Sequence, residues 1–148
     1  MDLGADELHA LLPDASIALG VEVETRDEAI RRAGALLVDA GAVEPSYVDQ
    51  MLEREHIVST FVGDGIAMPH GTLTAKSDVR AEGLCLLVLA EPVDWAGQPV
   101  TLVIGIAAHG RRYITLLSQL AATLLDDDRA AELRAATTPD RARQILAG

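Results

Sequence analysis

The sequence predicts a single α/β domain over residues 1–148, with a central mixed β-sheet flanked by helices on both faces. At 148 residues the chain is long enough for one domain with its own hydrophobic core. Two continuous apolar runs of strand length, 83–90 and 100–108, have the pattern of strands that are covered on both faces. Segments with helical periodicity lie before and after these runs, so helices are available for both sides of the sheet.

Two helices are predicted ahead of the apolar runs. The first covers 26–41 and ends at Gly41, a residue that favours the end of a helix. Thr25 and Glu28 form a capping box at its start. The second covers 45–57 and begins with a proline, which suits the first turn of a helix. Its inward-facing residues are predicted to be Val48, Met51 and Leu52.

The rest of the chain supplies short extended pieces and three further helices. The segment "FVGDGIAMPHG" is punctuated by glycine and is too short for a helix, so turns and short strands are expected there. Turn formers between the two apolar runs surround a short edge strand near 93–95. Helices are predicted over 111–127, 128–136 and 139–147. The buried stripe of the first of these three is expected to be Ile114, Leu117, Leu120, Ala121 and Leu124.

The chain is strongly acidic, and this charge excludes some classes of partner. Lys and Arg number 12 against 23 Asp and Glu, which gives a formal net charge of -11. Binding of nucleic acid depends on basic residues that neutralise phosphates, so this class of partner is excluded. The acidity suits a basic protein partner through complementary charge, although it can equally serve solubility alone.

Neither a disulfide nor a membrane segment is expected. The one cysteine, Cys85, lies in an apolar run and is predicted to pack as a small hydrophobic residue. The N-terminus lacks the pattern of a signal peptide. The longest apolar runs are about 8 to 10 residues, well short of the roughly 20 that cross a bilayer. We therefore expect a cytoplasmic protein without direct membrane insertion.

His70 is the main candidate for chemistry. It lies between Pro69 and Gly71, which indicates a stiff turn that exposes the imidazole. A neutral imidazole can attack a phosphoryl group, act as a general base or bind a metal. A structural role is the commoner case for a lone histidine, and no Cys or His lies at metal-ligand spacing around it. The chain also lacks a G-x-S-x-G nucleophile elbow and a P-loop, so the residues alone leave the chemistry open.

The stretch "MLEREHIVSTFVGDGIAMPHGT", followed by "LVIGIAA", resembles the IIA component of the sugar phosphotransferase system, in its mannitol/fructose class and mannitol-type branch. The resemblance extends from about Ala35 to the C-terminus. It implies that His70 accepts a phosphoryl group from the phosphocarrier protein HPr. The group then passes to a cysteine on the IIB component of a IIB/IIC sugar transporter. The resemblance implies no cofactor and no metal, and a monomer is the default for a carrier that exposes its site.

The resemblance also implies roles for the neighbours of His70. Arg54 matches the active-site arginine of the family and would stabilise the phosphoryl group; otherwise it only pairs with a surface acid. Backbone N–H groups at Gly71 and Thr72, with the Thr72 hydroxyl, are candidates to offset the added charge. Tyr113 stands where many mannitol-type members have a second histidine. It is expected to line the site without positive charge, which leaves more of the stabilisation to Arg54.

Three functions remain compatible with the sequence. The first is a phosphocarrier of a mannitol or fructose-type transporter. The second is a regulatory module of the nitrogen-related type, which controls partner proteins through its phosphorylation state. The third is a relative that has lost transfer and only binds partners, an option that Tyr113 keeps open and that the presence of Arg54 and His70 opposes.

Overall fold

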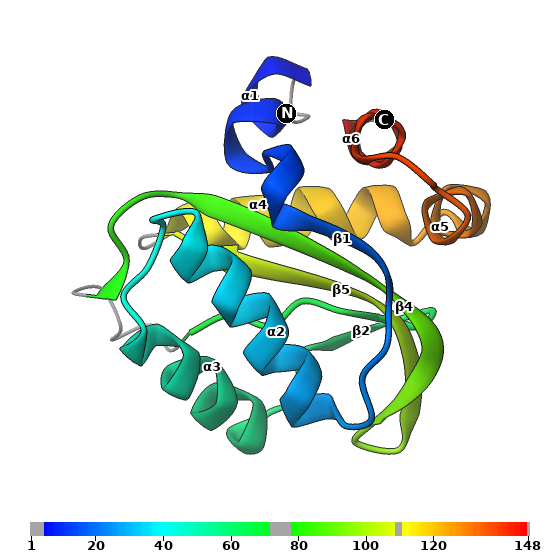
Figure 1. The fold of residues 1–148 in the computed structure, drawn as a ribbon. Coiled ribbons are helices and arrows are strands. Elements are labelled where there is room, and N and C mark those ends of the chain that lie inside the picture. The colour runs from blue at the N-terminus through cyan, green and yellow to red at the C-terminus, as the bar shows by residue number, and fades with distance from the viewer. Residues whose placement is uncertain (1–4, 72–77, 109–110, 148) are drawn as a thin grey trace.

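The computed structural model describes residues 5–71, 78–108 and 111–147. Within these ranges, five strands form one sheet in the order β1-β4-β5-β3-β2 (Figure 1). β1 pairs with β4 and β3 with β5 in parallel, whereas the β4–β5 and β2–β3 pairs are antiparallel. The prediction of a mixed sheet is therefore confirmed. The strands are β1 (Ile17–Val21), β2 (Phe61–Gly63), β3 (Ile66–Ala67), β4 (Gly83–Trp95) and β5 (Gln98–Ala107).

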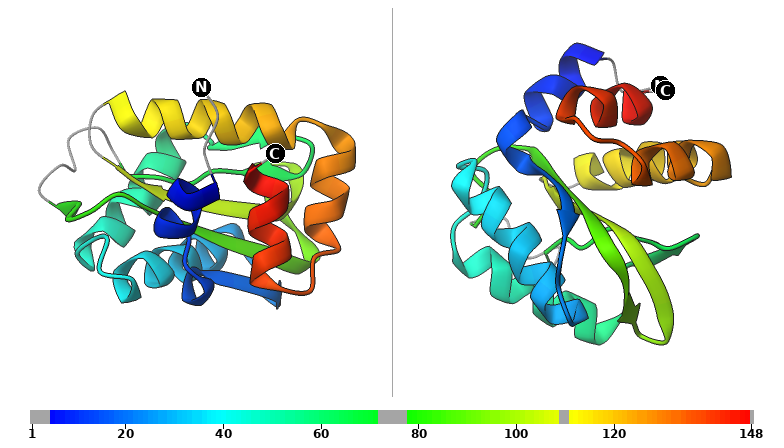
Figure 2. Two further views of the ribbon diagram at one scale, coloured as in Figure 1. Left: turned by 90° about the horizontal axis from the view of Figure 1, so that it is seen from above. Right: turned by 45° about the vertical axis from the view of Figure 1, so that its right-hand side comes forward.

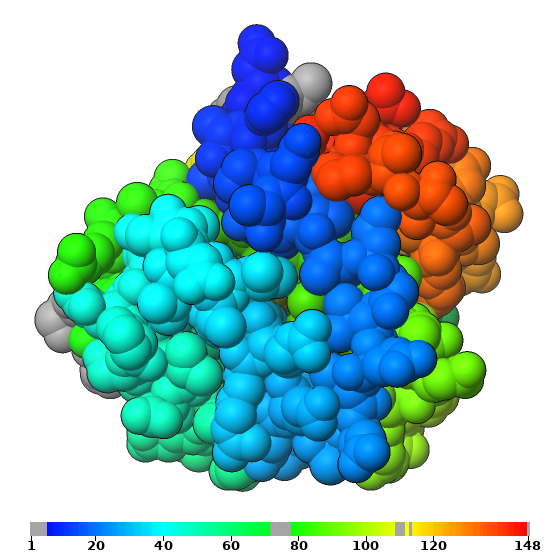
Figure 3. Space-filling model, viewed as in Figure 1, coloured from blue at the N-terminus to red at the C-terminus, as the bar shows by residue number. Residues whose placement is uncertain are grey.

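Helices cover both faces of the sheet, as predicted. α2 and α3 lie on one face, and the C-terminal helices with α1 lie on the other (Figures 1 and 2). The helices are α1 (Ala5–Leu11), α2 (Arg26–Asp39), α3 (Ser46–Ile57), α4 (Arg111–Leu124), α5 (Asp127–Arg134) and α6 (Pro139–Ala147), with a 3-10 turn at Asp14–Ser16. In the space-filling view, α2 and α3 lie side by side across the front, and α1 and α6 lie next to each other above them (Figure 3).

The two apolar runs read from the sequence form the centre of the sheet because successive strand residues point to opposite faces. Leu84 and Leu86 of β4 pack in the core under α4, α5 and α6. Cys85 and Leu87, which alternate with them, pack in the core under α2 and α3. Residues 83–89 and 102–107 are buried because they supply both cores at once, which explains why these stretches contain no charged or hydroxyl side chains.

Two local features behave as the sequence predicts. The side chain of Thr25 accepts a hydrogen bond from the backbone N–H of Glu28 at 3.1 Å and so caps α2. Gly41 follows α2 with a φ of 77°, a left-handed conformation that glycine adopts without steric cost. The segment after α3 forms the short strands β2 and β3, joined by a turn in which Asp64 and Gly65 have positive φ.

The predicted edge strand near 93–95 is wrong as a separate element. β4 continues to Trp95 through a register irregularity between Val88 and Val93, and it pairs with β5 as far as Trp95 and Gln98. Ala96 and Gly97 both have positive φ and close a tight hairpin turn of the kind that matches strand twist. The turn formers in this segment therefore bend a long hairpin and do not interrupt it.

The buried stripe of α4 is shifted from the predicted one. Leu116 is fully buried together with Leu120 and Leu124, whereas Ile114 is 52% exposed. Leu117 and Ala121 pack at the edge of the core. Two overlapping apolar stripes run along this helix, and the sheet beneath it decides which one faces inward.

The remaining differences concern the end of α4 and the residues before the first predicted helix. α4 ends before the predicted 127 because Asp126 caps α5, accepting from the backbone N–H of Asp128 at 3.0 Å. α1 and β1 precede the first predicted helix and were not expected. No helix in the described ranges is both long enough and apolar enough to span a bilayer.

Candidate functional site

His70 lies just after β3, in a segment that still runs parallel to β5. The backbone N–H of Ile106 donates to Pro69 O at 3.0 Å, and His70 pairs with Ile106 in a parallel bridge. Proline lacks an N–H, but its carbonyl still serves the ladder, so Pro69 is tolerated at this position. The backbone of His70 is therefore held by the central sheet, although it lies beyond the last residue of β3.

The imidazole is buried, not exposed. His70 is 6% exposed, and its Nδ1 lies 2.9 Å from the carbonyl oxygen of Met68. The prediction that a turn exposes the imidazole is therefore wrong in this conformation. The chain continues beside β5 through Pro69, and the ring of His70 contacts the backbone of its own segment at Met68 O. A carbonyl only accepts hydrogen bonds, so Nδ1 carries the proton in the neutral ring and the lone pair lies on Nε2.

The pKa of His70 is lowered from its usual value of 6.5. Burial is the main cause, and the nearby charge of Arg54 acts in the same direction. The hydrogen bond to Met68 O and the charge of Glu55 oppose the shift. The ring is thus neutral at pH 7, which is the form that has a nucleophilic nitrogen.

The inward face of α3 differs from the predicted one. Tyr47, Met51 and Glu55, spaced four residues apart, are its buried residues. Of the predicted inward residues, Met51 is buried, while Val48 and Leu52 are only partly buried. Sequence reasoning missed Tyr47 and Glu55 as contributors to the site, although their shared helical spacing with Met51 was a usable signal.

Tyr47 bridges the backbone around His70. Its hydroxyl donates to Ile106 O at 2.8 Å and accepts from the N–H of Gly71 at 2.8 Å. The Gly71 N–H was expected to face a phosphoryl group, but in this conformation it is bonded to Tyr47. A Cβ at Gly71 would lie 2.4 Å from the tyrosine ring, so the close approach requires glycine here.

Glu55 fixes the far end of the same helix face. It is 2% exposed, and its carboxylate accepts from the Thr60 hydroxyl at 2.8 Å. The backbone N–H of Thr60 and the indole N–H of Trp95 also donate to it. A buried carboxylate with three donors is well satisfied, so this acid ties α3 to the residue before β2 and to the last residue of β4.

Arg54 precedes Glu55 on α3 and brings positive charge to the site. Its Nη1 donates to Val58 O at 2.6 Å, at the C-terminal end of its own helix, and its charge contributes to the lowered pKa of His70. The alternative role for Arg54, pairing with a surface acid, has no support among the described residues.

The other predicted site residues fall differently. Tyr113 lies in the first turn of α4, but its side chain is outside the described residues, and Thr72 also lies outside them. Arg112, also in the first turn of α4, forms ion pairs with Glu7 and with Glu82, the latter at 2.9 Å.

Other candidate chemistry outside this site is structural. Cys85 is fully buried and burial raises its pKa to about 12, in agreement with the predicted packing role. Within the described ranges, no three His, Cys, Asp or Glu side chains are placed together to hold a metal ion.

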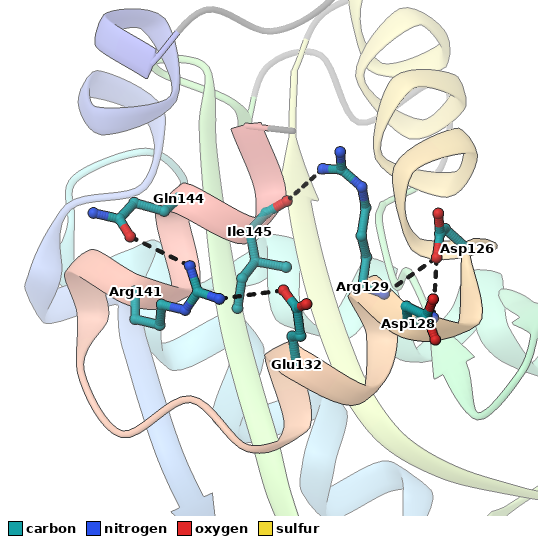
Figure 4. Close-up of a pocket in the computed structure, with 7 residues that line it drawn as sticks. All are labelled: Asp126, Asp128, Arg129, Glu132, Arg141, Gln144 and Ile145. Atoms are coloured by element: carbon teal, nitrogen blue, oxygen red, sulfur yellow. Dashed lines mark hydrogen bonds and ion pairs between the residues drawn. The ribbon is translucent and has the colours of Figure 1, made fainter.

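A shallow groove between α5 and α6 contains several charged side chains (Figure 4). Arg141 pairs with Glu132 at 3.2 Å across the two helices, and Arg129 donates to Ile145 O at 3.3 Å. These contacts join the two helices. They also occupy donors of the arginines that would otherwise be available to bind an anionic ligand. The groove is therefore a convenient place for control substitutions, since His70 is not among the residues that line it.

Comparison with known proteins fits this geometry. Residues 10–148 match the family model described as "Phosphoenolpyruvate-dependent sugar phosphotransferase system, EIIA 2". The mannitol-specific phosphotransferase enzyme IIA component of Halalkalibacterium halodurans is 42% identical over 139 residues, which make up 94% of this chain and 94% of that protein. The crystal structure of IIA mannitol from Escherichia coli has a TM-score of 0.84 and 39% identity, covering 90% of this chain and 96% of that one.

A second solved structure, the complex of enzyme IIA and phosphorylated enzyme IIB for mannitol from Escherichia coli, has a TM-score of 0.85. It is 38% identical, over 90% of this chain and 95% of that chain. The resemblance noted in the sequence is confirmed by these matches. The chain belongs to the EIIA 2 family of the phosphoenolpyruvate-dependent sugar phosphotransferase system.

Proposed function

We propose that this protein is a phosphocarrier in which His70 accepts a phosphoryl group from phosphorylated HPr and passes it to a cysteine of a IIB component. The observation that carries the proposal is the 2.9 Å contact between His70 Nδ1 and Met68 O. It fixes the tautomer that leaves the lone pair on Nε2. Together with the lowered pKa, it gives a neutral, oriented nucleophile at neutral pH.

Each of the two transfer steps forms one bond to phosphorus and breaks another. The Nε2 lone pair attacks the phosphorus, the bond from phosphorus to the donor breaks, and the donor keeps that electron pair. In the second step a thiolate of IIB attacks the same phosphorus, and the electrons of the N–P bond return to Nε2. The ring ends neutral, with the proton still on Nδ1 and donated to Met68 O.

Arg54 is proposed to stabilise the three phosphoryl oxygens during both steps. Its bond to Val58 O uses one of the five N–H donors of a guanidinium, and the planar fork can bind phosphoryl oxygens with others. Stabilisation by preorganised charge is usually the largest contribution to phosphoryl transfer. Tyr113, and Thr72 two residues after His70 in the chain, are also proposed to assist.

The partners follow from the family and from the relatives. The relatives named above are mannitol-specific, and one of them is in complex with phosphorylated IIB. We therefore propose HPr as donor, a mannitol-type IIB/IIC transporter as acceptor, a cytoplasmic location and a monomeric state. The regulatory function considered from the sequence has less support, because the relatives named above are mannitol-specific phosphotransferase components. The net charge of -11 suits a donor with a basic face.

The test is phosphorylation of the purified protein by phosphoenolpyruvate, enzyme I and HPr. Wild type is compared with His70→Ala and with Arg141→Ala, the control in the groove between α5 and α6. Mass spectrometry should find one phosphoryl group, stable in base and lost in acid, on wild type and on Arg141→Ala. It should be absent from His70→Ala. A wild type that stays unmodified while HPr is phosphorylated would overturn the proposal.

A second comparison separates charge from geometry at Arg54. Arg54→Lys keeps the charge but not the fork, and Arg54→Gln loses both. We expect the transfer rate to fall in the order wild type, lysine variant, glutamine variant, with the glutamine variant lower by about a hundred-fold or more, the effect of a missing donor to a transition-state oxygen. Equal rates in the three proteins would remove Arg54 from the mechanism.

A further inference from the structure

We propose that Tyr47 is a positioning residue for phosphoryl transfer, which sets the backbone directly after the nucleophile, the strand beside it and the helix that carries Arg54. The inference rests on the proposed function of His70. It concerns a residue that lies below the site and touches neither the phosphoryl group nor a partner, since Tyr47 is 3% exposed.

The tyrosine hydroxyl joins two segments that meet at His70. It accepts from the N–H of Gly71, the residue directly after His70, and donates to the carbonyl of Ile106, the residue paired with His70 across the sheet. Both distances are 2.8 Å, within the normal range for such bonds. Met68 O therefore holds the ring of His70, and the hydroxyl of Tyr47 holds the backbone that follows it.

The ring of Tyr47 makes this contact stiff. It packs directly on Gly71, so closely that a Cβ there would lie 2.4 Å from Cε1 and 2.8 Å from Cζ. Neither the peptide nor the ring can move toward the other. The hydroxyl thus fixes the direction of the Gly71 N–H, and with it the backbone that begins the segment after the nucleophile.

The same helix carries the cation. Arg54 follows Tyr47 by two turns of α3, about 10 Å along the axis at 1.5 Å per residue. Beyond Arg54, Glu55 binds Thr60 and Trp95. The buried face of α3 is thereby tied to the sheet at both ends, by Tyr47 near its start and Glu55 near its end. The distance between the guanidinium and the imidazole depends on both anchors.

The test variant is Tyr47→Phe, which removes only the hydroxyl. Its control is Leu133→Val, a change in α5 within the core on the other face of the sheet, where Leu133 is fully buried. Thermal unfolding of both variants is measured first. If Leu133→Val loses less Tm than Tyr47→Phe, Leu133 is truncated further so that the two variants lose the same Tm. Rates of phosphorylation by phosphorylated HPr are then compared, with wild type and His70→Ala alongside.

We expect kcat of Tyr47→Phe to fall about ten- to a hundred-fold, the scale of a catalytic group displaced by a fraction of an ångström to 1 Å. KM for phosphorylated HPr should change less than two-fold, because Tyr47 is buried. The control should keep both constants within two-fold of wild type. The Gly71 amide should also shift in the proton–nitrogen NMR spectrum of Tyr47→Phe and exchange faster with solvent.

An unchanged kcat in Tyr47→Phe would overturn the inference, as would an equal fall in a control of equal Tm. If wild type itself accepts no phosphoryl group, the proposed function fails, and the NMR spectra decide the positioning separately. In that case Tyr47→Phe should still shift the His70 ring resonances and the Gly71 amide, while the Leu133 control leaves them in place. Unshifted resonances would overturn it.

Discussion

Gly71→Ala isolates the contact between Tyr47 and the backbone after the nucleophile. The φ of Gly71 lies outside the left-handed region, so alanine can adopt this backbone, and any strain comes from the added Cβ. That Cβ would lie 2.4 Å from Cε1 of Tyr47, 2.8 Å from Cζ and 3.1 Å from Cδ1. Ordinary contacts of this kind lie at 3.4 to 4 Å, so the ring or the loop must move by about 1 Å.

Two opposing effects set the size of the change. Overpacking a well-filled site destabilises by about 1–3 kcal/mol, and a displacement of this extent belongs near the upper end. Replacing glycine also restricts the unfolded chain, which stabilises by about 0.4–1 kcal/mol. The net loss in the free energy of unfolding should be about 1.5–2 kcal/mol, or roughly 3–8 °C in Tm for a chain of this length.

Urea unfolding of Gly71→Ala, Tyr47→Leu and the double variant measures this contact. Tyr47→Leu removes the two ring atoms nearest the new Cβ, so the double variant should be more stable than the sum of the single changes predicts, by about 1 kcal/mol or more. An alanine variant as stable as wild type, or more stable, would show that the site tolerates the Cβ and would refute this packing. Additive changes would show that Tyr47 is not the obstacle.

Three further predictions follow from burial. Burial lowers the pKa of His70 below 6.5, so the unfolded chain binds the proton first as pH falls. The stability that the neutral ring contributes is therefore present above about pH 6.5 and lost below it. Between pH 7 and pH 5, the free energy of unfolding measured in urea should change less in His70→Gln than in wild type. With its pKa near 12, Cys85 should not react with iodoacetamide at pH 8 until guanidinium unfolds the protein; reaction of the native thiol would contradict its burial. Nη1 of Arg143 donates to Leu12 O at 3.0 Å. Arg143→Ala should therefore lower the free energy of unfolding by about 1–3 kcal/mol, as measured by thermal unfolding. A smaller loss would show that this bond is dispensable.

Local sequence patterns predicted most of the elements correctly. The apolar runs that became β4 and β5, the capped start of α2 and the span of α6 depend on residues within one turn or one strand of each other. Such patterns are readable because periodicity and capping involve close neighbours in the chain. Where two periodic readings overlapped, as in α4, the sequence did not distinguish them, and Ile114 was assigned inward although it is 52% exposed.

Local patterns and motifs in the chain were enough to predict the fold class, the order of the central elements, and the resemblance that singles out His70 and Arg54. Contacts between distant residues were needed to show that His70 is 6% exposed, which nitrogen carries its proton, and that Tyr47 and Glu55 belong to its surroundings. The hydroxyl of Tyr47 reaches residues 24 and 59 positions away, and the Glu55 carboxylate reaches Trp95, 40 positions away. Contacts between residues so far apart leave no local periodicity, because they exist only once the sheet has brought its strands and α3 together.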